Sequence, residues 1–254
     1  MPRGPRRARR LSRPEPQLAP SPDLPAGDFA PWLRAMRAAL QLGHDADVPC
    51  GDCCACCTTA HFVHIGAAEA DTLAHVPPAL LFSAPGHAPG TVLMGHDERG
   101  HCPLLEHCLC SIYEHRPLTC RVYDCRVFAA AGIDADRDEI TRRVRRWAFG
   151  HPTQRDRDEH AAVRTAARFV RRHAALLPPS GVPRDPPRLA VLAVTVSDAF
   201  LPARRATRDD RDGPGAGELT DGPGAGELTD DELARRVLDA ARRLMRMARP
   251  PGAS

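Results

Sequence analysis

The sequence predicts an α+β fold that is mostly α: helices surround a small cysteine-rich core with short strands, and both ends of the chain are disordered. Three observations support this prediction. All ten cysteines lie between Cys50 and Cys125, among short extended stretches, and we call this the cysteine segment. Helical patterns dominate from about residue 134 onward. The first 27 residues are rich in Arg and Pro, which is typical of a disordered arm.

Four segments are expected along the chain. The disordered basic arm covers 1–27, and a cysteine-cluster domain with a helical second half covers 28–205. A flexible linker covers 206–229, because DGPGAGELT occurs twice in tandem between 212 and 229. A basic amphipathic helix that begins with a capping box covers 230–249. Such a helix can bind a membrane surface or a partner, but packing on its own domain is the favoured interpretation.

The first half of the domain contains one long helix and several short elements. Asp28 opens a helix whose apolar residues recur at helical spacing until Gly43 ends it. Two short strands are expected at His61–Ile65 and Thr91–Met94, with a short helix over Ala67–His75 between them.

Helical turns follow toward the end of the cysteine segment. Ser111–Glu114 has the form of a capping box. Pro117 suits the first position of a helical turn that carries Cys120 and Arg121. Three longer helices are expected at Asp136–Trp147, Asp156–Leu177 and Pro187–Leu201.

The composition excludes several classes of protein. The chain has no Lys and no Asn, which excludes a Walker A lysine, a Schiff-base lysine and a Cys–His–Asn triad. A GxGxxG fingerprint for a nucleotide cofactor is also absent from the sequence. The net charge of +3 is too small to indicate nucleic acid as a partner. No apolar stretch approaches the roughly 20 residues that span a bilayer.

The Arg-rich start of the chain lacks the apolar segment that an export signal requires. We therefore expect a cytoplasmic protein. In a reducing cytoplasm, cysteine-dense segments usually bind metal rather than form disulfides.

The first five cysteines fall within eight residues, CGDCCACC, from Cys50 to Cys57. Repeated CxxC spacing is what zinc and iron–sulfur centres use. Cys56 is adjacent to Cys57, and adjacent side chains diverge, so a polynuclear cluster or two nearby metals suits them better than one tetrahedral ion. The downstream cysteines form no second CxxC pair, unlike those of a zinc ribbon. We expect an iron–sulfur or other polynuclear iron centre, for example [4Fe–4S], with Zn²⁺ as the alternative.

Two arginines, Arg116 and Arg121, are candidate cofactor-binding residues. Cluster sulfurs are electron-rich, and guanidinium donors near them stabilise that charge or hold an anionic substrate. A structural salt bridge explains either arginine equally well. His101, His107 and His115 also lie near thiols in the sequence, but surface histidines are the simpler interpretation.

The cysteine segment resembles the CxxCxxCC family, also called YkgJ-like, whose domain is described as zinc- or iron-chelating. The matching motifs are the initial CxxCxxCC, then C-P-x-L, then C-x-I-Y-E-x-R-P-x-x-C-R. The resemblance leaves Cys54 and Cys108 outside the pattern. It implies metal binding by eight cysteines: Cys50, Cys53, Cys56, Cys57, Cys102, Cys110, Cys120 and Cys125.

Three roles are open at this point. The centre could serve a cluster-dependent enzyme, a redox module, or a zinc protein whose metal is structural and whose role is protein interaction. The family includes relatives of flagellin-lysine methylases, so the resemblance also implies a protein-modifying enzyme as a further alternative. The sequence identifies neither a catalytic residue nor a substrate. The partners expected are metal ions and an unidentified protein or substrate.

Overall fold

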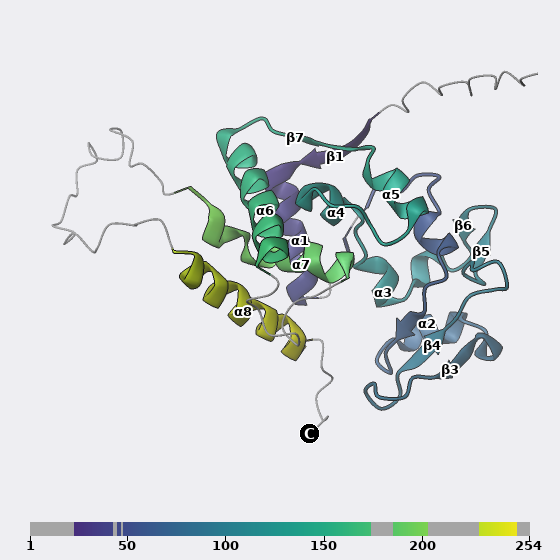
Figure 1. The fold of residues 1–254 in the computed structure, drawn as a ribbon. Helices are drawn as coiled ribbons and strands as arrows, with labels where there is room; N and C mark the ends of the chain where they lie inside the picture. Colours follow the sequence, from purple (N-terminus) through teal and green to yellow (C-terminus); the bar gives the residue numbers. More distant parts are fainter. Residues whose placement is uncertain (1–22, 43–44, 47, 174–184, 203–228, 248–254) are drawn as a thin grey trace, which may run out of the picture.

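The computed structural model describes residues 23–42, 45–46, 48–173, 185–202 and 229–247. Helices predominate and strands are few and short, which confirms the predicted α+β, mostly α class (Figure 1). Residues 1–22 of the expected arm and 206–228 of the expected linker lie outside the described residues.

The helices and strands follow one another along the chain as numbered in Figure 1. The α-helices are α1 (Phe29–Leu42), α2 (Ala70–His75), α3 (Leu118–Arg121), α4 (Arg126–Ala131), α5 (Asp138–Val144), α6 (Gln154–Arg172), α7 (Pro186–Val196) and α8 (Asp230–Met247). The strands are β1 (Leu24–Asp28), β2 (Val63–Ile65), β3 (Leu81–Ser83), β4 (Val92–Met94), β5 (Leu105–Glu106), β6 (Leu109–Cys110) and β7 (Trp147–Gly150). Short 3-10 turns are η1 (Ala55–Thr58), η2 (Pro78–Leu80), η3 (Tyr113–His115) and η4 (Ser197–Phe200).

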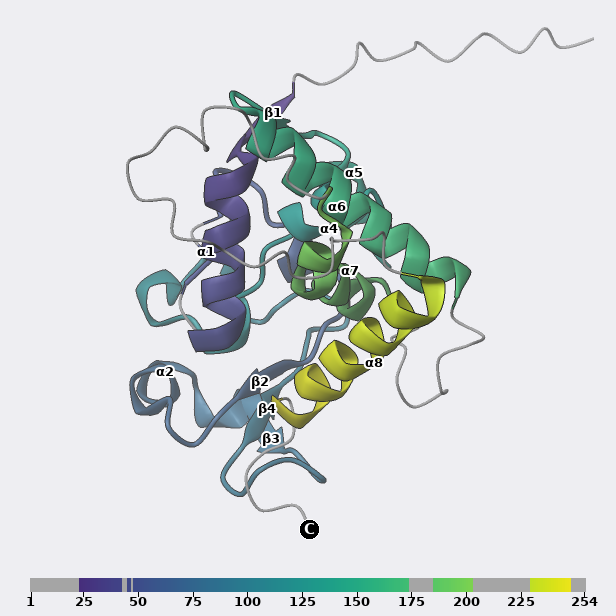
Figure 2. The same ribbon diagram turned by 90° about the vertical axis from the view of Figure 1, so that its left-hand side faces the viewer.

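Helices α1, α4, α6, α7 and α8 pack around one large core, and we call this part of the molecule the helical lobe (Figures 1 and 2). Its fully buried side chains include Phe29 and Leu33 of α1, Phe128 of α4 and Leu192 of α7. Helix α1 presents these residues on one face because its apolar positions recur every three or four residues. None of the helices in the described ranges is long and apolar enough to cross a membrane.

Helix α8 lies along the helical lobe (Figure 2). Val237 is fully buried, and Ala240 and Ala241 are nearly so, where α8 contacts α7. The apolar face of the expected basic helix therefore packs on the chain's own core, which removes this apolar area from water.

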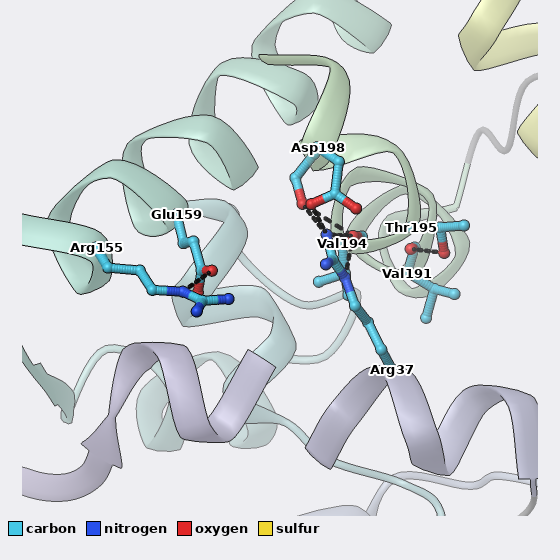
Figure 3. Close-up of polar contacts among 8 residues, drawn as sticks. Arg37, Arg155, Glu159, Val191, Val194, Thr195 and Asp198 are labelled. Atoms are coloured by element: carbon cyan, nitrogen blue, oxygen red, sulfur yellow. Dashed lines mark hydrogen bonds and ion pairs between the residues drawn. The ribbon is translucent and has the colours of Figure 1, made fainter. Parts of the chain in front are cut away.

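Arg37 joins α1 to the end of α7 (Figure 3). Its Nη2 donates to the carbonyl oxygen of Val194 at 3.2 Å, to Ser197 Oγ at 2.8 Å and to Asp198 Oδ1 at 2.9 Å. A cation at this position stabilises the helix because the last carbonyl groups of a helix lack partners within it. On the neighbouring α6, Arg155 Nε donates to Glu159 Oε1 at 2.7 Å (Figure 3).

Strands β1 and β7 pair in parallel, with Leu24 opposite Trp147 and Asp28 opposite Gly150. This pairing differs from two sequence expectations. The predicted disordered arm extends to residue 27, although β1 begins at Leu24, and the predicted helix extends to Trp147, although α5 ends at Val144. The two strands are more than 100 residues apart, so neither has a partner that local sequence patterns reveal.

The cysteine segment has its own small antiparallel sheet, in the order β2-β4-β3, and a separate β5-β6 pair. Beneath them lies a small core of four buried residues, Ile65, Val76, Met94 and Leu104. Strands β2 and β4 and helix α2 fall within the ranges predicted for them, while β3, β5 and β6 are additional.

Candidate metal centre

Backbone hydrogen bonds bring the cysteines together from separate parts of the cysteine segment. Cys50 and Cys53 lie in the loop before η1, which carries Cys56 and Cys57. The amide of Cys102 donates to the carbonyl oxygen of Cys57 at 2.7 Å. This bond holds the downstream cysteines, which begin at Cys102, next to the run that ends at Cys57. Cys110 is in β6, Cys120 in α3, and Cys125 immediately precedes α4.

Electrostatic effects between thiols show that they form one cluster centred on Cys56. After burial, which is the largest cause, the negative charge of Cys56 raises the pKa values of Cys50 and Cys120. The same charge also contributes to the raised pKa values of Cys102 and Cys125. Cys53 acts on Cys50, and Cys110 on both Cys102 and Cys120. Together with Cys57, these interactions link all eight of the cysteines in the predicted ligand set.

Burial and the neighbouring thiols raise the pKa values of five of these cysteines, namely Cys50, Cys56, Cys102, Cys120 and Cys125. The pKa values of Cys120 and Cys125 rise to about 12, mainly through burial. The pKa of Cys56 is raised mainly by its hydrogen bond with Cys57, and then by burial. A metal ion relieves both effects, because it binds thiolates and neutralises their charge. The donor set therefore fits a thiolate-bound metal.

The contact between Cys56 and Cys57 differs from the expected divergence of adjacent side chains. Both lie in the 3-10 turn η1, and their thiols are within hydrogen-bonding contact. By contrast, among the described residues no three cysteine sulfurs lie within 4.8 Å of one another. The sulfurs thus lie in one region of the structure, but no three of those described are close enough together to bind one metal ion without moving.

The cysteine cluster lies between the two hydrophobic cores. Cys125 and Tyr123 pack against the large core of the helical lobe, whereas Cys102 and Ile112 pack against the small core. A metal held by this cluster would therefore join the two parts of the molecule.

Cys54 and Cys108, the two cysteines outside the family pattern, pair with each other. Their sulfurs are 2.15 Å apart and their Cα atoms 5.2 Å apart, as in a disulfide. The left-handed backbone at His107 and Cys108 forms the turn between β5 and β6 that presents Cys108. This disulfide departs from the expectation of metal binding in preference to disulfides, but all eight predicted ligands are free thiols.

The two candidate arginines have different surroundings. The charge of Arg116 lowers the pKa of Cys120, which places Arg116 beside the cysteine cluster. Its guanidinium lies over the ring of Tyr113, 3.6 Å from the ring centre. Arg121 instead pairs with Asp45 at 3.2 Å, and its Nε donates to the carbonyl oxygen of Arg116 at 3.0 Å. The contacts of Arg121 are therefore those of a structural salt bridge.

Two residues at the cluster were not identified from the sequence. Trp147 Nε1 donates to Cys125 Sγ at 3.2 Å, and Arg143 Nη2 donates to the carbonyl oxygen of Cys50 at 2.9 Å. The Arg143 guanidinium also lies over the Trp147 ring, 4.7 Å from its centre. Both residues come from outside the cysteine segment, so no motif spacing points to them.

A buried ion pair holds the last cysteine in place. Asp124 accepts from Arg126 Nη2 at 2.9 Å and from Trp32 Nε1 at 2.8 Å. Arg126 also donates to the carbonyl oxygens of Ala26 and Ala46. Since Asp124 directly precedes Cys125, this network fixes Cys125 relative to β1 and α1.

The cysteine segment matches a known family. Residues 49–143 match the CxxCxxCC family, whose description is "Putative zinc- or iron-chelating domain", and this confirms the resemblance seen in the sequence. The match includes all ten cysteines and extends to Arg143 in α5. Comparisons with curated proteins and with solved structures found no match.

Proposed function

We propose that the metal-binding cysteine domain at residues 49–143 holds a polynuclear iron centre of the iron–sulfur type, with [4Fe–4S] as the expected form. The observation that carries this proposal is the single network of eight thiols centred on Cys56. The ligands would come from Cys50, Cys53, Cys56, Cys57, Cys102, Cys110, Cys120 and Cys125.

The number and spacing of the thiols support a polynuclear centre over a single zinc ion. A structural zinc site uses four ligands, and its sulfurs lie about 3.8 Å apart when each is about 2.3 Å from the ion. Here eight thiols share one region, and among the described residues no three of their sulfurs lie within 4.8 Å of one another. Polynuclear centres hold their cysteine sulfurs farther apart, because each sulfur binds a different metal atom.

The surroundings of the cluster suit a redox or cluster-dependent role. An iron–sulfur centre supplies one-electron transfer, and its potential depends on hydrogen bonds to sulfur and on exposure to solvent. In this chain Trp147 donates to Cys125, and Arg116 places a positive charge near Cys120. Both would stabilise negative charge on the sulfurs. Arg116 Nε is buried without a hydrogen-bond partner among the described residues, so it can hold an anion beside the centre.

Structural zinc is the second candidate, and the position of the cluster supports it. The small core has four buried hydrophobic residues, too few to be stable alone, and the cysteines lie between it and the large core. Zinc bound there would hold the cysteine segment on the helical lobe, and the surface so formed would serve protein interaction.

The first experiment is metal and acid-labile sulfide analysis of the full chain purified without oxygen, together with a visible spectrum. Iron and sulfide in comparable amounts are expected; zinc without sulfide would overturn the iron–sulfur proposal and establish the second candidate. We also propose a cytoplasmic location, where the eight thiols stay reduced.

Cys56→Ser and Cys54→Ser provide a matched pair of variants within the same eight-residue run. Cys56→Ser is expected to lose most of the bound metal, because Cys56 is the centre of the thiol network. Cys54→Ser should retain the metal, because Cys54 is paired with Cys108. Equal metal content in the two variants would contradict the proposed ligand set.

A further inference from the structure

A second group of metal-ligating side chains lies outside the cysteine cluster. Asp71 and His75 are one turn apart on α2, and His115 reaches them from η3. One candidate ligand atom from each residue lies within 4.8 Å of the other two. This is the only such group of three or more among the described residues.

The backbone around this group is held in place by side chains that are not part of it. Glu69 Oε1 accepts from the amide of Gly66 at 2.7 Å, and Glu69 Oε2 accepts from the amide of Leu118 at 2.6 Å. Thr72 Oγ1 donates to the carbonyl oxygen of Arg116 at 3.4 Å. These hydrogen bonds connect α2 to the segment that follows η3, so the backbone positions of Asp71, His75 and His115 are fixed relative to one another.

The donor atoms have spacings close to those of ligands on one ion. His115 Nδ1 is 2.8 Å from Asp71 Oδ2, and His75 Nδ1 is 3.8 Å from Asp71 Oδ1. Ligand atoms on one tetrahedral ion, each about 2.05 Å from it, lie about 3.3 Å apart. The two imidazole rings are stacked, with centres 3.5 Å apart and planes 4° apart. Without metal, His115 Nδ1 is hydrogen-bonded to Asp71 Oδ2, and His75 Nδ1 lies 2.8 Å from the backbone carbonyl oxygen of Asp71. Metal binding would replace both contacts and would require the two rings to tilt out of their stacked arrangement.

The surroundings leave room and charge for a cation. A pocket of about 280 Å³ lies against Asp71 and His115, so water can complete the coordination. Arg116 and Arg121 also line this pocket, but each has another contact: Arg121 pairs with Asp45, and the Arg116 guanidinium lies over the Tyr113 ring. The Asp71 side chain is 71% exposed and those of His75 and His115 about 40%, so a bound ion exchanges readily with solvent.

We propose that Asp71, His75 and His115 form a second, exchangeable metal site that is independent of the cysteine cluster. Two imidazole nitrogens and one carboxylate suit Zn²⁺ and the neighbouring divalent ions Co²⁺ and Ni²⁺, rather than Mg²⁺ or Ca²⁺. Three protein ligands with a remaining position open to water is also the arrangement of exchangeable, catalytically competent zinc sites.

Titration of the purified full chain with Co²⁺ tests this proposal, because thiolate and nitrogen–oxygen sites differ spectroscopically. Cobalt bound to thiolates has sulfur-to-metal charge-transfer absorption, whereas cobalt at the proposed site has only d–d bands. Some of the Co²⁺ that the wild-type chain binds will produce charge-transfer absorption. We expect one further equivalent to bind that adds d–d bands without increasing this absorption. The double variant His75→Ala/His115→Ala should lose that equivalent and keep the charge-transfer absorption.

Asp71→Asn keeps the shape of the side chain and should weaken binding of the additional equivalent on the order of a hundredfold. His87→Ala is the matched control: the His87 ring lies 4.5 Å from that of His64, in a pair that belongs to no three-residue ligand group among the described residues. This variant should bind as the wild type does.

The proposal is overturned if the double variant binds as much Co²⁺ as the wild-type and His87→Ala chains. Titration with Zn²⁺ followed by the imidazole NMR signals gives a second measurement in the wild-type chain. The signals of His75 and His115 should shift together and before those of His64 and His87; equal shifts of all four would also overturn it. Both measurements compare chains that carry the same cysteine cluster, so the metal of that cluster is a constant background in them.

Discussion

Trp147 contacts the cysteine cluster from strand β7, outside the cysteine segment. Burial raises the pKa of Cys125 to about 12 even though the indole N–H of Trp147, which donates to Cys125 Sγ, lowers it. Hydrogen bonds to a ligand sulfur stabilise the thiolate and adjust the affinity and potential of the metal. A single side chain can therefore act on the centre without binding the metal.

Trp147→Phe is expected to lower the metal affinity of the protein by about tenfold, because the aromatic ring is kept and only the donor to Cys125 is lost. Competition with a chromogenic chelator measures this change. Trp32→Phe is the control, since its indole N–H donates to Asp124 and not to a sulfur. That variant loses one bond of the Asp124 network but none to a sulfur, so its metal affinity should fall less than that of Trp147→Phe. Similar affinities in the two variants would show that the bond to Cys125 has no effect.

At the scale of elements, the contact between α6 and α1 includes a buried histidine. The His160 ring stacks on Phe29, with ring centres 4.2 Å apart. His160 Nε2 accepts from Arg164 Nε at 3.1 Å, since a guanidinium can only donate. The neutral ring therefore carries its proton on Nδ1, which is 2.7 Å from His151 Nε2. Burial, and then the charge of Arg164, lowers the pKa of His160 from 6.5 to about 4.

This lowered pKa predicts that acid weakens the packing of α6 on α1. The unfolded chain binds the His160 proton more tightly than the folded chain does. The contribution of neutral His160 to the free energy of unfolding is therefore fully present above pH 6.5. It falls as the pH drops toward 4, by about 3 kcal/mol in all. Urea unfolding at a series of pH values between 7 and 4 measures this loss.

His160→Phe keeps a ring against Phe29 and removes the titrating group, so its stability should depend less steeply on pH over this interval. His96→Phe, at an exposed position, should follow the wild-type curve. The assignment to His160 is wrong if the two variants have the same pH dependence.

At the scale of the whole molecule, two hydrophobic cores of very different size meet at the cysteine cluster. The large core has more than twenty buried residues from six helices, whereas the small core has four. Hydrophobic burial grows with core size, so the helical lobe can be stable without metal while the cysteine segment depends on it.

Removal of the metal with a chelator is therefore expected to unfold the cysteine segment and spare the helical lobe. Hydrogen exchange should become fast for the amides of the β2-β4-β3 sheet and stay slow in α6. The Cys56→Ser variant should show the same pattern without a chelator. Uniform loss of protection in both parts would mean that the two cores form one cooperative unit.

Much of the secondary structure could be predicted from local patterns. Helix α1 and strands β2 and β4 fall close to their predicted ranges because their apolar spacing and their flanking Gly and Pro residues are local signals. Strands β1 and β7 have no such signal, because each is stabilised by the other across the chain. The helix expected at Asp136–Trp147 ends at Val144 because Trp147 belongs to strand β7 and pairs with Leu24 of β1.

The sequence by itself determined that the protein has a cysteine-rich metal-binding domain, because closely spaced thiols have few other uses and their spacing is visible along the chain. Only the tertiary structure decided which groups surround those thiols. Trp147 and Arg143 reach Cys125 and Cys50 from about 20 and 90 residues away, and His115 meets Asp71 across 44 residues. These contacts depend on how the helical lobe and the small sheet pack together, since hydrogen bonds and electrostatic forces act between neighbours in space rather than in sequence.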